Sequence, residues 1–199
     1  LYGLNEVAGV GTGSLDLRGA GSTFTLGSGA TLSTGGNNTL LAGGGIILSG
    51  GSTVVGGNGP NDSTKLNFSP ATLTGEVSFR VDNPDQTLVL NGVFTGGTGT
   101  FRKDGPGQVL LTQTGNAVDT LNLAAGSLGF VVGSDSSAVN LTANSVTLGA
   151  GTMINVSGFH GTALGESVPL IRLTNAITGN ATSYEVGGET GGGDYLSAT

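Results

Sequence analysis

The sequence contains no cysteine and no tryptophan, and it has one histidine and one methionine in 199 residues. Without cysteine, disulfides and thiolate metal sites are excluded. The absence is compatible with export through an oxidising compartment, where a stray thiol is a hazard. No run approaches the roughly 20 apolar residues of a membrane helix. No signal peptide begins at Leu1, so we expect any export signal to lie outside this segment.

Charge is also scarce. Charged residues make up 10% of the chain, and 6 basic residues face 13 acidic ones, which gives a formal net charge of −7. Six scattered basic residues form no electrostatic footprint for nucleic acid or for anionic membranes. We therefore expect no nucleic-acid partner.

Glycine is the residue that the chain has in excess, with 40 copies. Its spacing follows no Gly-X-Y period, which excludes collagen. Hydrophobic residues make up 36% of the chain, too many for a segment that stays unfolded because it lacks a core. Both facts indicate a folded, turn-rich β protein.

Short stretches with apolar residues two apart recur every six to twelve residues and end at glycine-rich turns. Examples are Leu15-Asp16-Leu17, Phe24-Thr25-Leu26, Leu66-Asn67-Phe68, Leu121-Asn122-Leu123 and Val146-Thr147-Leu148. Such short strands suit the flat sides of a coil, and their approximate recurrence is typical of a solenoid. We predict an all-β fold, a right-handed single-stranded parallel β-helix of about ten coils with roughly 20 residues each.

One region carries a specific motif. Residues 99–112 read Gly-Thr-Phe-Arg-Lys-Asp-Gly-Pro-Gly-Gln-Val-Leu-Leu-Thr, and Gly115-Asn116 follow. This phrase resembles the autotransporter-associated β-strand repeat. Downstream, residues 120–128, 146–154 and 165–171 resemble the last coils of pertactin-like passengers, which act as an autochaperone. The chain is therefore similar to the passenger region of a type V autotransporter.

The resemblance divides the chain into three parts: shaft coils over 1–98, C-terminal coils with the repeat and the autochaperone-like region over 99–186, and a flexible edge or linker over 187–199. It implies export through the periplasm and outer membrane to the cell surface or the medium. It also implies an outer-membrane β-barrel in the same polypeptide as a partner, and virulence-associated adhesion to host-cell or matrix components, or self-association.

Residues able to carry chemistry are few and scattered. The only histidine, His160, lies in a Gly-Phe-His-Gly phrase, and we interpret it as a solvated turn residue; Glu166 is the nearest acid in sequence. Asp62 ends a single approximation of the calcium-binding nonapeptide, one place late, whereas such sites need adjacent repeats. We interpret the loop around Asp62 as a glycine-rich turn.

The remaining charged candidates lie near turns or strand ends. Asp82 and Asp85 flank Pro84 and are interpreted as turn formers. Arg102 and Lys103 form the only adjacent basic pair, and we expect both on a solvated face. We therefore predict no catalytic residue, no metal site, no cofactor and no small-molecule substrate.

Three functions are consistent with these observations. The first is a non-catalytic surface stalk with an adhesive or self-associating face, whose C-terminal part templates folding during secretion. The second is a supporting β-helix for an enzyme or toxin whose catalytic domain lies N-terminal to this segment. The third is a β-helical carbohydrate lyase or hydrolase, which requires Asp62, Asp82, Asp85 or His160 to converge on one face.

Overall fold

The computed structural model describes residues 14–16, 23–34, 39–42, 45–56, 63–68, 70–96, 98–133, 135, 137–159, 168–175, 177–179 and 185–188. Every regular element in these ranges is a β-strand, which confirms the expected all-β class. The described part of the chain therefore also contains no helix that could cross a membrane.

The strands are short, as the sequence predicts. The first ten are β1 (Ser14–Asp16), β2 (Phe24–Leu26), β3 (Thr31–Thr34), β4 (Thr39–Ala42), β5 (Ile46–Ser49), β6 (Thr53–Gly56), β7 (Ser63–Phe68), β8 (Ala71–Thr74), β9 (Glu76–Val81) and β10 (Thr87–Asn91). The next nine are β11 (Thr100–Asp104), β12 (Gln108–Leu111), β13 (Asn116–Leu123), β14 (Ser127–Val132), β15 (Leu141–Leu148), β16 (Met153–Phe159), β17 (Ile171–Leu173), β18 (Ile177–Gly179) and β19 (Glu185–Gly188).

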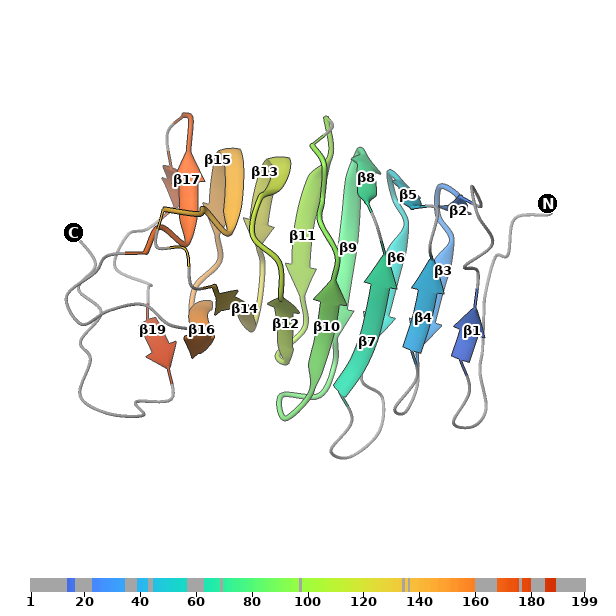
Figure 1. The fold of residues 1–199 in the computed structure, drawn as a ribbon, viewed down its shortest axis with the longest axis horizontal. Coiled ribbons are helices and arrows are strands. Elements are labelled where there is room, and N and C mark those ends of the chain that lie inside the picture. Colours follow the sequence, from blue (N-terminus) through green and yellow to red (C-terminus); the bar gives the residue numbers. More distant parts are fainter. Residues whose placement is uncertain are drawn as a thin grey trace.

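These strands form three parallel sheets that run along a solenoid, with β1 and β2 near one end and β17 to β19 near the other (Figure 1). Sheet 1 has the order β1-β4-β7-β10-β12-β14-β16-β19. Sheet 2 has the order β17-β15-β13-β11-β9-β6-β3, and β18 also pairs with β15. Sheet 3 has the order β2-β5-β8 and is extended by isolated bridges at Phe94 and Thr95. The chain visits sheets 3, 2 and 1 in turn, which is the path of a parallel β-solenoid.

The coils are longer and more variable than expected. Gln108 pairs with Ser127, 19 residues later, whereas Leu141 pairs with Ile171, 30 residues later. Between Phe24 and Val132 the chain completes five circuits, and sheet 1 contains eight strands over its whole length. The expected count of ten coils is therefore wrong, because loops between the strands use residues that the estimate assigned to further coils. The right-handed sense stays a prediction.

The expected division of the chain also stays a prediction. Sheet 2 is continuous across residue 98, because β9 pairs with β11 over five consecutive positions. The boundary at residue 187 falls within β19, and residues 189–199 lie outside the described ranges.

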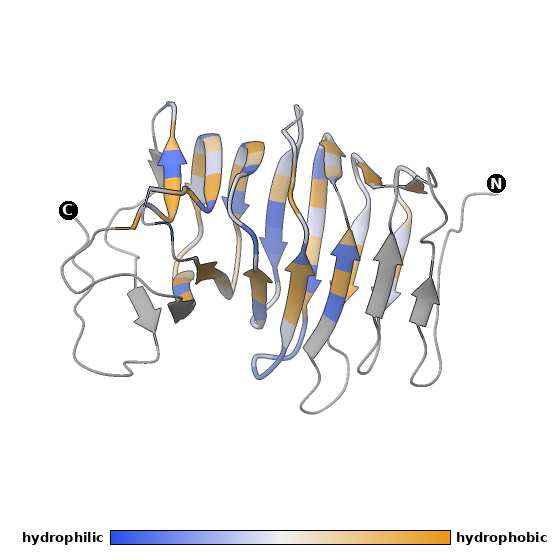
Figure 2. Cartoon of the chain, viewed as in Figure 1, coloured by the Kyte–Doolittle hydropathy of each residue, from blue (hydrophilic) through white to orange (hydrophobic). Residues whose placement is uncertain are grey.

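The core follows from the alternation of side chains along each strand. In β9, for example, Val77, Phe79 and Val81 are buried, whereas the residues between them are half-buried or exposed. Figure 2 shows the same alternation of apolar and polar positions along the strands. Because parallel strands stack in register, each inward residue lies above an inward residue of the next coil. One continuous apolar cluster results, from Phe24 to Val146.

Aromatic residues fill the middle of this cluster. The rings of Phe79 and Phe101, which are register partners two residues apart in alignment, stack with centroids 4.2 Å apart. Phe94 meets both rings edge-on, at 5.7 and 5.5 Å, and Phe68 at 5.2 Å. Offset and edge-to-face contacts of this kind add to the free energy gained from burial alone. The phenylalanines therefore pack inside the solenoid, as the sequence predicts.

Glycine permits close stacking at the corner between sheets 2 and 1. Gly126 has φ of +70°, and a Cβ atom there would lie 2.5 Å from the Gly107 carbonyl oxygen and closer still to that of Gly105. The corner of one coil thus rests directly on the backbone of the previous one. A side chain at this position would force the two coils apart.

Replacing Gly126 with alanine should therefore destabilise the chain more than the same change at Gly115. Gly115 also has positive φ, +78°, but a Cβ atom there would meet nothing within 4 Å. Both variants carry the backbone strain of about 1–2 kcal/mol, and only Gly126→Ala adds a steric clash of about 1–3 kcal/mol. Denaturant unfolding measures both, and equal losses would show that the corner has room to relax.

Candidate functional site at a charged corner

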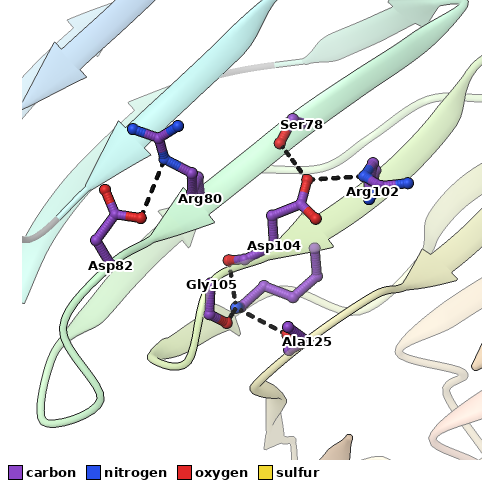
Figure 3. A network of polar contacts seen from close by, with 8 residues as sticks. Ser78, Arg80, Asp82, Arg102, Asp104, Gly105 and Ala125 are labelled. Carbon is purple, nitrogen blue, oxygen red and sulfur yellow. Dashed lines mark hydrogen bonds and ion pairs between the residues drawn. The ribbon is translucent and has the colours of Figure 1, made fainter. Parts of the chain in front are cut away.

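Charged side chains gather where β9 and β11 lie side by side in sheet 2. Outward positions of these strands carry Glu76, Arg80, Arg102 and Asp104, and Arg80 is the register partner of Asp104. Two neighbouring coils thus place cations and anions in alternation on one polar face (Figure 3). We call this set, together with Ser78 and Asp82, the charged face.

Asp104 is the centre of the charged face. Its Oδ2 accepts hydrogen bonds from the Ser78 hydroxyl at 2.7 Å and from Arg102 Nε at 2.8 Å. Burial tends to raise the pKa of Asp104, but these two hydrogen bonds and the nearby charges of Arg102 and Lys103 outweigh it and lower that pKa. The hydrogen bond to Asp104 in turn raises the pKa of Arg102. Asp104 is therefore ionised and holds Arg102 in one orientation.

A second pair repeats this arrangement one coil earlier. Arg80 Nε lies 3.1 Å from Asp82 Oδ1, and both side chains are about half exposed, at 49% and 51%. In both pairs the carboxylate uses only Nε of the guanidinium, and within the described residues no contact occupies the two terminal nitrogens. These nitrogens are the donors that bind carboxylate and sulfate groups in a bidentate manner. Figure 3 shows the two guanidinium groups on opposite sides of the Ser78–Asp104 contact.

Lys103 lies beneath the charged face and contradicts the expectation of a solvated side chain. It is fully buried, at 0% exposure, because the alternation in β11 turns it inward together with Phe101. Its register partners are Phe79 on one side and Leu123 on the other, both core residues. The physical reason is that its stem fills a place in the apolar column while its ammonium group leaves the column at the strand end. Arg102, the other member of the pair, is on the outer face with 34% of its side chain exposed.

Backbone carbonyl groups surround the Lys103 ammonium. Nζ donates to the carbonyl oxygens of Asp104 and Gly105, both at 2.7 Å, and to that of Ala125 at 3.1 Å (Figure 3). The first two belong to the turn after β11, and Ala125 belongs to the corresponding turn of the next coil. All three protons of the ammonium group are thus used within the chain. Lys103 is not presented to a ligand, and its role is to join two coils.

Burial lowers the pKa of Lys103 to about 8, although the charges of Asp104 and Asp82 act to raise it. A lysine in the unfolded chain titrates near its ordinary value of 10.5. Between these two pH values the unfolded chain binds more protons than the folded chain, so unfolding becomes less favourable as the pH rises. Below pH 8 the lysine is protonated in both states, and the desolvation penalty is fully present.

The free energy of unfolding of the wild-type chain minus that of Lys103→Met should therefore rise between about pH 8 and pH 10.5. The rise is at most about 3 kcal/mol, since one pKa unit corresponds to about 1.4 kcal/mol. Denaturant titrations of both proteins from pH 6 to 11 measure it, and groups common to both cancel in the difference. A difference that falls with pH would mean that the folded state favours the charged lysine.

The other sequence-predicted residues do not join the charged face, apart from Asp82. Asp85 lies in the turn between β9 and β10, where its backbone N–H donates to Asn83 Oδ1 at 3.0 Å. Asp62, His160 and Glu166 lie outside the described residues. The convergence that a lyase requires is therefore not observed for the two aspartates that are described. In the same ranges, no group of three or more histidine and acidic side chains has the spacing of a metal site.

Two buried asparagines are structural residues that sequence analysis missed. Asn116 Oδ1 accepts from the Phe94 N–H at 3.0 Å, and its Nδ2 donates to the Gln113 and Asn140 carbonyl groups at 2.6 and 3.0 Å. Asn140 repeats the role one coil later, since its Nδ2 donates to the Val131 carbonyl at 2.8 Å. Only the recurrence of asparagine just before an apolar strand residue could have indicated these positions.

The fold and the charged face can now be compared with known proteins. No protein-family model matches the chain. Searches among curated proteins and solved structures likewise give no match. What stands on the structure alone is a parallel β-solenoid with a mixed-charge outer face and a lysine buried beneath it.

Proposed function

We propose that this chain is a non-catalytic segment of an autotransporter passenger that serves as a surface stalk with an adhesive or self-associating face. The observation that carries this proposal is the stacking of parallel coils around one continuous apolar cluster. Such a structure is extended along one axis, and each coil contacts only its neighbours. It therefore holds whatever is attached to it at a distance, while its outward side chains stay accessible.

The location follows from the same proposal. A passenger is exported through the periplasm and outer membrane and is displayed at the cell surface or released. The motif over residues 99–112, which resembles the autotransporter-associated repeat, supports this assignment, and it spans β11, the charged corner and β12. The outer-membrane β-barrel of the same polypeptide is the partner that this role requires.

We assign adhesion to the charged face on sheet 2. Its ligands are matrix or host-surface components that carry carboxylate or sulfate groups, because two oriented guanidinium groups offer free terminal nitrogens. The neighbouring outward positions are mostly hydroxyl and amide side chains. Thr120 Oγ1 and Ser145 Oγ, for example, lie 3.0 Å apart on adjacent coils. A long polar surface of this kind suits extended, hydrophilic ligands such as acidic glycans.

Replacing Arg80 and Arg102 together with glutamine should weaken binding of the displayed protein to an immobilised sulfated or uronate-containing glycan by about tenfold or more, since a hydrogen bond to a charged group contributes about 1.5–3 kcal/mol. The remaining binding should depend less on salt. The matched control is Lys65→Gln with Arg172→Gln, which removes two exposed basic residues from β7 and β17. Equal losses in both double variants would show that net charge, and not the charged face, governs adhesion.

We further propose that the C-terminal coils template folding during secretion. Sheets 1 and 2 continue without a break through β13, β14, β15 and β16, so these coils offer edges on which the preceding coils can stack. Addition of a coil to an existing edge avoids the loss of entropy that is required to start a new stack. A stable end therefore speeds folding of the rest.

Deleting residues 120–173 should abolish folding and surface display of the full-length protein. The control deletion is 24–70, which removes two coils in register, because Phe24 pairs with Ile46 and Ile46 with Ala71. Protease resistance and surface labelling of intact cells measure the outcome. If the 120–173 deletion is displayed and folded as well as the control, the templating proposal is wrong.

The alternative is a supporting β-helix for an enzyme or toxin. It shares the stalk function, and it differs only in a catalytic domain N-terminal to this segment. The full-length sequence distinguishes the two, since a protease or esterase domain upstream would favour the alternative.

A further inference from the structure

The apolar core does not by itself define how one coil stacks on the next. In sheet 2, Leu121 is the register partner of Phe101, and Leu123 is that of Lys103. A slip of β13 by two residues keeps the same side chains inward and exchanges one leucine for the other. Neighbouring β14 has the same property, because Leu128 and Phe130 are both inward. Burial of apolar surface therefore differs little between the native and the slipped arrangement.

Lys103 is the one charged side chain among the buried residues of the described chain. Its column contains Val54, Phe79, Leu123 and Leu148 at the other coils, all apolar. An ammonium group placed in such a column needs partners at one definite point, whereas a leucine does not. The lysine therefore distinguishes arrangements that the leucines cannot.

The native partners are available only in one register. Ala124 and Ala125 donate their N–H groups to the Lys103 carbonyl at 2.9 and 3.3 Å, and Ala125 returns its own carbonyl to Nζ. A two-residue slip would bring the Leu123 or Ser127 carbonyl into that place. The Leu123 carbonyl already accepts from the Gly149 N–H at 2.7 Å, and Ser127 begins β14. The ammonium would lose its third partner inside the fold.

We infer that Lys103 fixes the register in which the coil of β13 and β14 stacks on the coil of β11 and β12. The closest analogy is a single polar residue in the core of a coiled coil, which specifies register at a cost in stability. Lys103 is a positioning residue in this sense. The inference deepens the proposed templating role and rests on it only for its consequence during secretion.

Engineered cysteines can report the register, because the chain has none of its own. Thr100→Cys with Thr120→Cys joins native register partners, and Thr100→Cys with Asn122→Cys joins residues that meet only after a two-residue slip. Each pair is built into the whole chain with Lys103, with Lys103→Met and with Lys103→Gln. Lys65→Met, at an exposed position on β7, is the matched control. The proteins are refolded from denaturant under oxidising conditions, and the disulfide-linked fraction is measured by mass.

With Lys103 or Lys65→Met, only the native pair should crosslink efficiently. With Lys103→Met, the slipped pair should crosslink several-fold more and the native pair less, while circular dichroism still shows β structure. Lys103→Gln should lie between, because an amide donates to fewer carbonyl groups. The inference is overturned if the slipped pair stays at background in both variants. It is also overturned if both variants remain unfolded, because the lysine would then be needed for stability in any register.

These outcomes are separate from the surface-display experiment. Refolding in solution tests the register alone, without a secretion machinery. A chain whose register depends on Lys103 but whose 120–173 deletion is still displayed would retain this inference and lose the templating proposal. The converse result would retain templating and assign the register to another feature.

Discussion

Hydrogen bonding between the backbones of successive coils is the constraint on which the rest of this structure depends. Every strand described here pairs in parallel with a strand one coil away, so each peptide group finds its partner about 20 to 30 residues further along the chain. Inward side chains consequently stack on inward side chains, and corners stack on corners. The stacking explains the high glycine content, since at Gly126 the backbone of one coil rests on that of the coil before. It also explains why so few charges suffice, because the outer faces are covered by hydroxyl and amide groups that bond to their equivalents on the next coil.

Much of this could be predicted from the local pattern. The alternation in Phe24-Thr25-Leu26 gives a strand with both apolar residues inside, and the structure has that strand and that orientation. The number of coils could not be predicted in the same way. Coil length depends on how many residues each loop uses, and loops such as the one between Leu141 and Ile171 carry no periodic signal. The asparagines are a second example, because the partners of Asn116 are a carbonyl of the next coil and an N–H of the previous one.

Lys103 shows how a general rule can conceal a specific signal. Lysine is almost never fully buried, and the adjacent Arg102 and Asp104 favour a solvated strand. Yet residues 101 and 103 are two apart in one strand, so an inward phenylalanine requires an inward lysine. The alternation was the stronger argument, because it is imposed by backbone geometry and holds for every residue of the strand. The same alternation places Arg102 and Asp104 together on the outside, where their ion pair forms.

The buried lysine and the charged face are two consequences of one local design. Burial lowers the pKa of Lys103 to about 8, which means that the folded chain holds the charged form at a cost. Such a cost is not explained by stability, since a methionine would fill the column without it. It is explained if the apolar columns admit more than one register, because a charge that needs three carbonyl groups is satisfied in a single arrangement. Correct register then also determines the outer surface, since Arg80 lies beside Asp104 only when β9 and β11 are aligned as observed. In this way a residue that never meets a ligand decides which side chains the ligand would find.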